Sequence, residues 1–312
     1  MKPELINVLI CPQCHVSLDL QVHEEREGQI YAGRLRCQHK GCEYPISRYV
    51  PRFVDADAYA DSFSKQRLYV RRHFRHYLDD RSGDQLFFPT TGFAEQHIGS
   101  GPILEVGCGY GRFVDVVQRQ GGAIIGIDLS THSIDLAQDF VGLRDNVHLI
   151  QCDLFQLPFR QAYFTHIYSI GVLHHTPDTR KAFAALVPYL RSHGQMSIWV
   201  YPPSMKTSTD RWRPLTMRLP HSMLYAFCIV NQGLFSWIRG LPGGWRFSRL
   251  IPGVGPGPGR KFWLRVMSDF DDLSPTYAST HTPEEVHAWF VEEGLQEVRM
   301  LPRHTSVTGY KK

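Results

Sequence analysis

Between residues 101 and 200, short apolar runs alternate with segments of helical periodicity. The runs predicted to be strands are 103–106, 123–127, 147–151, 164–170 and 195–200. Helical spacing follows the first run through Phe113, Val116 and Val117, and Pro177 marks the start of a helix after the fourth. This alternation predicts a parallel sheet with helices on both faces, whose ligands lie at the carboxyl ends of the strands.

The C-terminal segment predicts one more helix and two more strands. Thr282 and Glu285 match a capping box, and Gly294 is placed to end the helix that follows. Residues 295–301 and 306–310 read as strands joined by a short turn, which would pair antiparallel at one edge of the sheet. The expected fold class is α/β, with a doubly wound, mostly parallel seven-stranded sheet.

The turn after the first predicted strand carries glycine at alternate positions, Gly107, Gly109 and Gly111. Glycine lets a ligand approach the backbone closely. A dinucleotide fingerprint would need a further glycine where Arg112 stands, so nicotinamide binding is disfavoured. A compact turn of this kind suits a cofactor without phosphates, such as S-adenosylmethionine.

Two acids follow the glycine turn at the ends of later strands. Asp128 ends the second strand, 21 residues after Gly107, where an acidic residue can accept both ribose hydroxyls. Asp153 ends the third strand and could accept from the adenine amino group. Both acids are therefore candidate ligands for a nucleoside.

The motifs E-V-G-C-G-Y-G, I-D-L-S, C-D-L and V-L-H-H occur in this order from Glu105 to His175. With this order and spacing, residues 101–200 resemble the core of class I S-adenosylmethionine-dependent methyltransferases of the bacterial type. The cofactor contacts that the resemblance implies are Glu105, Gly107, Cys108, Gly109, Gly111, Asp128, Leu129, Asp153, Leu154, Ser169 and Ile170. Glu105 would anchor the methionine amino group, usually through water. An unrelated doubly wound protein, or a methyltransferase fold that binds no cofactor, are the alternatives.

Methyl transfer from a sulfonium is an in-line displacement, so a base is needed only if the acceptor carries a proton. His174 and His175, after the fourth strand, are candidates because a neutral imidazole can take that proton. The alternative is that one of them packs or bonds the backbone. Tyr277 and His281 form a second candidate set, in a segment that loosely resembles the C-terminal part of bacterial methyltransferases modifying sugars, lipids or secondary metabolites. A structural role is the alternative there.

Four cysteines lie within the first 42 residues, as a C-x2-C pair and a C-x4-C pair separated by 22 residues. Cys11, Cys14, Cys37 and Cys42 could place four thiolates tetrahedrally around Zn²⁺, which would make a structural site. Metal-free thiols are the alternative, and His39 could replace one of the second pair. The segment that follows resembles the tail of small zinc-ribbon proteins, including an activator subunit that some methyltransferases recruit in trans.

The remaining cysteines, Cys108, Cys152 and Cys228, are scattered. The first two are expected to pack as small apolar side chains. The N-terminus has no secretory signal pattern, and no stretch reaches the ~18 uncharged apolar residues of a membrane span. Together with clustered cysteines, these features predict a cytoplasmic protein without a transmembrane segment.

After Val200 the alternation breaks. Residues 201–268 carry ten basic residues and one acid, a charge of +9, although the whole chain is only +4. The interleaved aromatic residues favour a phosphate-bearing or lipid-linked small-molecule acceptor, or peripheral contact with an anionic membrane. RNA is an alternative, since ribosomal RNA base methyltransferases combine a zinc module with this core. A protein substrate and a non-catalytic zinc-ribbon scaffold are further alternatives.

The sequence thus predicts an S-adenosylmethionine-dependent methyltransferase acting on a small metabolite, with the acceptor atom and the oligomeric state left open. Five regions are expected. They are a zinc-ribbon-like module (1–54), a helical segment covering the cofactor (55–100, including Tyr59, Phe63 and Gln66), the core (101–200), a basic helical lid (201–268), and the C-terminal part of the core (269–312).

Overall fold

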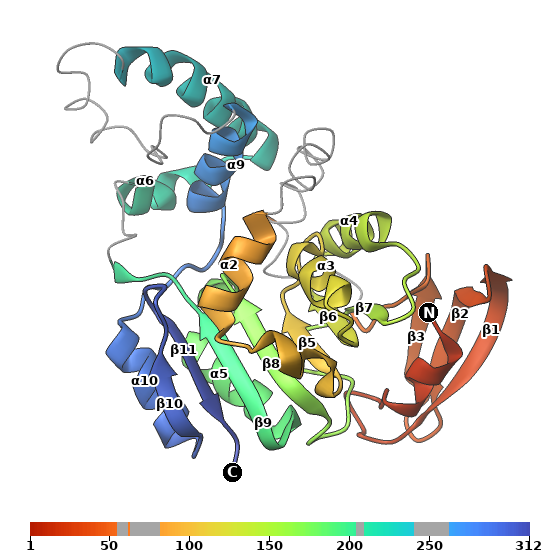
Figure 1. Ribbon diagram of the computed structural model, residues 1–312. Helices are drawn as coiled ribbons and strands as arrows, with labels where there is room; N and C mark the ends of the chain where they lie inside the picture. The colour runs from red at the N-terminus through yellow and green to blue at the C-terminus, as the bar shows by residue number, and fades with distance from the viewer. Residues whose placement is uncertain (55–61, 63–81, 204–208, 240–261) are drawn as a thin grey trace.

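The computed structural model describes residues 1–54, 62, 82–203, 209–239 and 262–312. Within these residues, the central sheet has seven strands in the order β10-β11-β9-β8-β5-β6-β7 (Figure 1). The strands are β5 (Ile103–Val106), β6 (Ile124–Asp128), β7 (Val147–Gln151), β8 (Phe164–Ile170), β9 (Leu190–Trp199), β10 (Gln296–Met300) and β11 (Ser306–Tyr310). Strands β5 to β9 pair in parallel, whereas β11 pairs antiparallel with both β9 and β10. The predicted α/β architecture and its antiparallel edge are confirmed.

Helices cover both faces of this sheet. One face carries α2 (Ser82–Thr91), α3 (Arg112–Arg119) and α4 (Thr131–Val141), and the other carries α5 (Thr179–Leu186) and α10 (Pro283–Glu292). Three short 3-10 turns lie in the connections: η3 (Glu95–Ser100), η4 (Leu173–His175) and η5 (Val187–Tyr189). Because both faces are covered, the central strands are almost entirely buried, as parallel strands require.

Polar caps begin several of these helices. The Ser130 hydroxyl accepts from the Ser133 amide at the start of α4, and Thr282 and Glu285 form the expected capping box before α10. The start of α5 differs from the prediction, because Asp178 is the cap and the helix begins at Thr179, two residues after Pro177. Strand β9 also starts earlier than expected, at Leu190.

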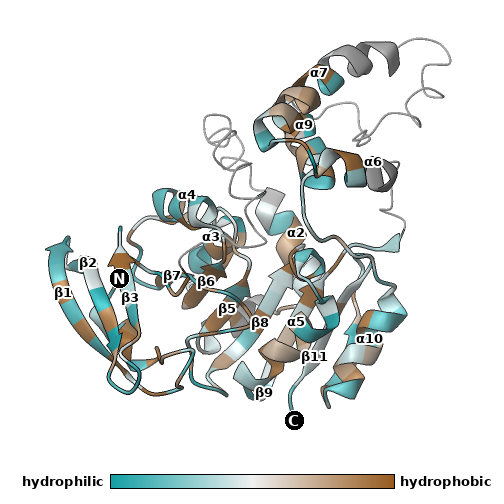
Figure 2. Cartoon of the chain, turned by 180° about the vertical axis from the view of Figure 1, so that it is seen from behind, coloured by the Kyte–Doolittle hydropathy of each residue, from teal (hydrophilic) through white to brown (hydrophobic). Residues whose placement is uncertain are grey.

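The N-terminal module is a separate four-stranded antiparallel sheet that follows a 3-10 turn, η1 (Pro3–Asn7). Its strands are β1 (Leu18–Arg26), β2 (Gln29–Cys37), β3 (Glu43–Ser47) and β4 (Val50–Pro51). In Figure 2, β1 is largely hydrophilic in colour, whereas β6 of the central sheet is hydrophobic. The contrast follows burial, since β1 is mostly exposed and β6 is covered on both faces.

This module is docked on strand β7, which would otherwise be an open edge of the central sheet. The Phe53 amide donates to the Gln151 carbonyl (2.8 Å), and Arg52 pairs with Gln151 as a parallel bridge. The Arg52 guanidinium also donates to Ser47 Oγ, Gln151 Oε1 and Asp135 Oδ1, each at 2.7 Å. The module therefore covers a strand edge that could otherwise pair with another chain.

A second contact lies at the opposite end of the module. The Ile10 amide donates to the Pro158 carbonyl (3.0 Å), and Leu9 pairs with Phe159 as an antiparallel bridge. Buried side chains of the module, including Leu9, belong to the same apolar cluster as those of β5, β6 and β8. The module and the central sheet thus share one hydrophobic core.

The described part of the insertion after β9 is helical, as expected. It contains α6 (Thr209–Thr216), α7 (His221–Arg239) and α9 (Phe262–Leu273), and α7 and α9 pack together around Leu224, Cys228 and Phe270. Helix α9 ends five residues beyond the expected boundary at 268. These helices rise from the edge of the sheet where the parallel strands end (Figure 1).

Some expectations fall on residues that the structure does not describe. Tyr59, Phe63 and Gln66, which were expected to cover the cofactor, lie outside the described residues. Much of the basic charge of the insertion, from 240 to 261, also lies outside them. The five-region division of the chain therefore stays a prediction.

Replacing Arg52 by alanine should weaken the docking of the module. The side chain is 12% exposed, and its loss leaves Gln151 and Asp135 without their shared donor. We expect the free energy of unfolding, measured by urea denaturation, to fall by about 2–3 kcal/mol. Arg48→Ala is the matched control: Arg48 contacts Asp135 and Asp139 from a side chain that is 40% exposed, and its loss should cost below about 1 kcal/mol. Equal losses would contradict this role for Arg52.

Candidate functional site

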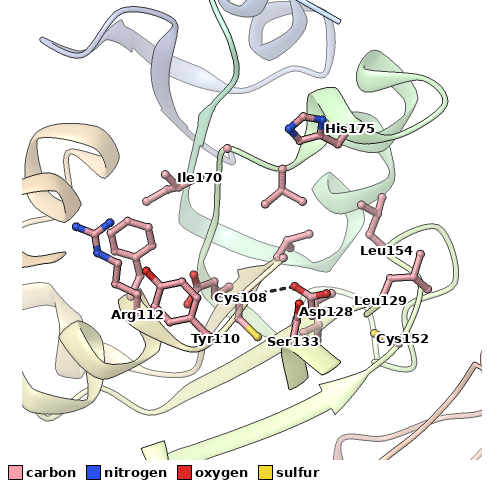
Figure 3. A pocket seen from close by; sticks show the side chains of 18 of the residues that line it. Cys108, Tyr110, Arg112, Asp128, Leu129, Ser133, Cys152, Leu154, Ile170 and His175 are labelled. Atoms are coloured by element: carbon pink, nitrogen blue, oxygen red, sulfur yellow. Dashed lines mark hydrogen bonds between the residues drawn. The ribbon is translucent and has the colours of Figure 1, made fainter. Parts of the chain in front are cut away.

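The carboxyl ends of β5, β6 and β8 surround a pocket of about 230 Å³ (Figure 3). It is lined by Glu105, Val106, Gly107, Cys108, Gly109, Tyr110, Arg112, Phe113, Ile127, Asp128, Leu129, Ser133, Cys152, Leu154, Ile170, Gly171, Val172, His175 and Thr176. A concave, mainly apolar site with a few charged groups suits a small molecule. The pocket lies where the strand alternation predicted a ligand site.

The glycine turn forms the floor of the pocket. Gly107, Gly109 and Gly111 have φ angles of 75°, 56° and 86°, a left-handed region that favours glycine. A Cβ on Gly107 would lie 2.4 Å from Val172, so a larger residue there would collide with the turn after β8. Gly111 is different, because it caps α3 and packs near Val141 instead of lining the pocket.

Asp128, at the end of β6, joins two turns of the site. Its Oδ2 accepts from the Gly109 amide and its Oδ1 accepts from the Ser130 amide, both at 2.8 Å. In Figure 3 the carboxylate lies beside the loop that carries Cys108, and the dashed line marks one of these bonds. A carboxylate can accept about four hydrogen bonds, and this one lines the pocket. The group is placed to receive a diol from a ligand.

Glu105, at the end of β5, is the buried acid of the pocket. Its side chain accepts from Tyr168 Oη (3.0 Å), and the residue is 2% exposed. Burial, and to a smaller extent the Asp128 charge, raise the Glu105 pKa well above its usual value. A cationic amine entering the pocket would favour the ionised carboxylate. The chemistry of Glu105 therefore fits the amino group of a methionine moiety.

Apolar side chains line much of the rest of the pocket. Leu129, Leu154 and Ile170 project into the pocket in Figure 3, and two thiols, Cys108 and Cys152, border it. Burial raises the pKa of both thiols, so they remain protonated and apolar at neutral pH. Leu129 and Leu154, on the same side of the pocket in Figure 3, offer an apolar surface for an adenine ring.

His175 is the predicted catalytic residue that lines the pocket. Its Nδ1 lies 2.9 Å from the Tyr277 carbonyl oxygen, which can only accept, so Nδ1 carries a proton. Burial lowers the His175 pKa to about 4, and the nearby Arg213 contributes to this. At neutral pH the ring is uncharged, with Nε2 as its acceptor nitrogen.

His174 does not reach the pocket. It is fully buried, with its ring 3.8 Å from that of Tyr201 and 4.1 Å from that of His175. Neither ring nitrogen has a hydrogen-bond partner within the described part of the chain. Burial lowers the His174 pKa well below its usual value. The geometry therefore makes it a packing residue behind His175.

The second predicted catalytic set is also absent from the lining. Tyr277 contributes its backbone carbonyl to His175, and its side chain is 39% exposed. His281 lies 2.9 Å from Ser279 Oγ and packs against Trp289. These residues brace the loop behind His175 and do not face the pocket.

Two residues implied as cofactor contacts lie beside the lining. Ser169 is fully buried and donates to the Val106 carbonyl (3.0 Å), which joins β8 to β5. Asp153 accepts from the Phe155 amide (3.0 Å) in the turn after β7. Both lie at strand ends near the pocket without reaching its surface in this conformation.

Sequence reasoning missed several lining residues, among them Tyr110, Arg112, Phe113, Ser133, Cys152, Val172 and Thr176. Tyr110, Arg112 and Phe113 lie within or directly after the glycine turn, and this position in the sequence was the available signal. The contact between the insertion and the pocket had no such signal: Met267 of α9 packs with Tyr110 and Tyr225. The insertion therefore reaches the rim of the pocket.

The cysteines of the N-terminal module gather at one place. The sulfur atoms of Cys11, Cys14 and Cys42 all lie within 4.8 Å of one another. Cys37 is not part of this trio, although its amide donates to the Cys42 carbonyl (2.8 Å). Thiolate sulfur is a preferred ligand of Zn²⁺, so these three sulfur atoms could hold such an ion.

Comparison with known proteins assigns the core of the chain. Residues 104–198 match the family model described as a methyltransferase domain. The matched residues span most of β5 to β9, and the pocket lies at the carboxyl ends of these strands. Among the described helices, none is both long and apolar enough to cross a membrane.

Three curated relatives share part of this domain. An uncharacterized protein of Synechococcus sp. is 34% identical over 36% of this chain and 28% of its own length. The 27-O-demethylrifamycin SV methyltransferase of Amycolatopsis mediterranei is 26% identical over 46% of this chain and 55% of its own. The probable tRNA methyltransferase 9B of Mus musculus is 25% identical over 43% of this chain and 29% of its own. Each alignment spans less than two thirds of the relative.

A solved structure extends over more of the chain. The phosphoethanolamine N-methyltransferase 2 of Haemonchus contortus is 14% identical and covers 82% of this chain and 47% of its own, with a TM-score of 0.47.

The buried carboxyl of Glu105 should make stability depend on pH. The pKa of Glu105 in the folded protein is raised above the usual 4.5, so below that pH the buried neutral carboxyl does not lower the free energy of unfolding. As the pH rises from there toward the folded pKa, the free energy of unfolding falls, because the unfolded chain loses this proton first. Glu105→Gln should remove this loss, so the variant should gain on the wild type by up to about 1.4 kcal/mol per pH unit across that window. Urea denaturation at a series of pH values above 4.5 checks this. Parallel curves for the two proteins would contradict a buried, neutral Glu105.

Proposed function

We propose that this chain transfers a methyl group from S-adenosylmethionine to a small-molecule acceptor. The observation that carries the proposal is the Asp128 carboxylate, which bridges the glycine turn and the start of α4 inside the pocket. S-adenosylmethionine supplies an activated methyl group on a sulfonium. The protein has to bind it, exclude water and orient the acceptor in line with the breaking bond.

The charged and the apolar residues of the pocket lining would hold different parts of the cofactor. Glu105 would hold the methionine amino group, the glycine turn would pass under the methionine chain, and Asp128 would accept the ribose hydroxyls. Leu129 and Leu154 would bracket adenine, and Ile170 would face the ligand from the other side of the pocket. Asp153 is proposed to reach the adenine amino group after a movement of the turn that follows β7, because it does not line the pocket in this structure.

His175 is the proposed base when the acceptor carries a proton. Its neutral ring can accept at Nε2 while Nδ1 stays bonded to the Tyr277 carbonyl. Burial makes this imidazole a weak base, so the residue would serve best when the acceptor proton becomes acidic as the methyl group is transferred.

A small molecule is favoured as the acceptor because the site is a pocket, and Met267 of the insertion packs on Tyr110 at its rim. The similarity to a rifamycin methyltransferase supports this choice. RNA is the second candidate, since a probable tRNA methyltransferase is also among the relatives. An anionic or lipid-linked acceptor, and peripheral contact of the basic insertion with a membrane, remain proposals that rest on its sequence charge of +9. The alternative of a non-catalytic scaffold predicts no cofactor binding.

We also propose that the N-terminal module holds a structural Zn²⁺. Cys11, Cys14 and Cys42 would be ligands from the assembled trio, and Cys37 would complete the set. The ion would fix the turn between Cys11 and Val16, from which Ile10 reaches the central sheet.

Titration calorimetry with S-adenosylhomocysteine tests the cofactor site. Asp128→Asn should weaken binding by about 10–100-fold, because it removes the charge of an acceptor facing the ribose. Asp139→Asn, on the exposed side of α4, should bind as tightly as the wild type. Absence of binding to the wild type would favour the scaffold, and salt-sensitive retention of RNA by the same sample would favour the RNA candidate.

Metal analysis of the purified protein tests the zinc proposal. The wild type should contain about one zinc per chain, and Cys42→Ser should contain less than about half of that, since a thiolate ligand is lost. Cys228→Ala, in the distant helix α7, should keep its zinc. A wild type without zinc after expression in zinc-supplemented medium would contradict the proposal.

A further inference from the structure

Helix α7 of the insertion has an inner and an outer row of apolar side chains. The inner row, Leu224 and Cys228, is buried against α9. The outer row is Met223, Phe227 and Val230, which follow one another at the intervals typical of one side of a helix. All three are exposed, Met223 by 58% and Val230 by 61%. Helix α7 therefore presents an apolar side that no described residue covers.

The segment before α7 adds further exposed apolar side chains. Trp212 and Leu215 lie one turn apart on α6, and Met217 follows that helix. We call these three side chains and the outer row of α7 the apolar insertion surface; hydrophobic colour is visible on both helices in Figure 2, away from the central sheet. Its members are six of the twelve large apolar side chains exposed in the described residues, all between positions 212 and 230. Apolar residues exposed singly are ordinary, whereas such a concentration indicates an interaction surface.

The charge around this surface is positive. Arg218, in the turn between α6 and α7, is exposed, and no described carboxylate forms an ion pair with it. Helix α7 contains no acidic residue. Asp269 of α9 does contact α7, but it is buried and accepts from the side-chain amides of Asn231 (2.8 Å) and Gln232 (2.6 Å). With the +9 charge of residues 201–268, the surface fits a partner that is both apolar and anionic.

A bilayer that contains anionic lipids has both properties, because its headgroups are negative and its acyl chains accept apolar side chains. A second copy of the chain fits less well, since it would bring two basic segments together. Nucleic acid is anionic, but its bases stack on aromatic rings, and four of the six exposed side chains are leucine, methionine or valine. The composition of the surface therefore favours a membrane.

We propose that the apolar insertion surface docks on an anionic membrane, with the outer row of α7 among the acyl chains and Arg218 at the level of the headgroup phosphates. The inference assigns a specific surface to the membrane contact that the sequence charge alone suggested, and it does not depend on the proposed methyl transfer. Because Met267 of α9 packs on Tyr110 at the rim of the pocket, docking would place an element that reaches this rim at the lipid surface.

The test is cosedimentation of the full chain with vesicles. The wild type should bind phosphatidylcholine vesicles containing about a third phosphatidylglycerol at least about tenfold more tightly than vesicles of phosphatidylcholine alone. Val230→Ser should weaken binding to the anionic vesicles about fivefold, because an apolar side chain is lost from the buried side. Arg218→Gln should weaken it by a similar factor, about fivefold, through the lost charge.

Val291→Ser is the matched control for Val230→Ser. It makes the same change at a valine of α10 that is 55% exposed, and it should bind the anionic vesicles as the wild type does. The replaced side chains are all exposed, so each variant should keep the circular dichroism spectrum of the wild type.

The other outcomes overturn the inference. A wild type that does not bind the anionic vesicles would contradict it, as would an equal loss of binding in Val230→Ser and Val291→Ser. Retention of RNA without vesicle binding would assign the surface to nucleic acid. A dimer in analytical ultracentrifugation that Val230→Ser dissociates, again without vesicle binding, would assign it to a second copy of the chain. Titration with S-adenosylhomocysteine is a separate measurement, so failure of the proposed function remains distinguishable from failure of this inference.

Discussion

The site depends on the carboxylate of Asp128. By accepting from the amides of Gly109 and Ser130, it joins the turn that precedes α3 to the turn that precedes α4. These turns belong to neighbouring parallel strands, so their separation is set by the sheet and their orientation by this one side chain. The Asp128 carboxylate holds the glycine turn in place. The turn therefore needs no side chain of its own for this, and its backbone can stay open to a ligand.

The N-terminal module is connected to the second of these turns by hydrogen bonds. Arg52 donates to the Gln151 side chain, and Gln151 in turn donates to the Leu129 carbonyl (3.0 Å) and to Thr131 Oγ1 (2.9 Å). A continuous chain of hydrogen bonds therefore leads from the cysteine-bearing module to the residue next to Asp128. Because the module and the sheet also share one apolar core, metal binding in the module would stabilise the wall of the pocket.

The sequence was sufficient for the features that depend on local order. Strand alternation predicted the sheet, and the position of Asp128 at the end of β6 predicted its place in the pocket. The directions of side chains at strand ends were harder to predict, because neighbouring positions face opposite sides of the strand. Ser169 is buried against β5, whereas Ile170 lines the pocket. Tertiary packing decides which of His174 and His175 lines the pocket, and it also brings Arg303 to Trp199. Spacing along the chain reveals neither.

A crystal structure of the wild type with S-adenosylhomocysteine tests the central claim most directly. The account predicts that both ribose hydroxyls lie within hydrogen-bonding distance of the Asp128 carboxylate while the Gly109 and Ser130 amides remain bonded to it. It also predicts the ligand amino group beside Glu105. A ligand bound elsewhere, or an Asp128 side chain that leaves both amides and contacts no ribose oxygen, would contradict it.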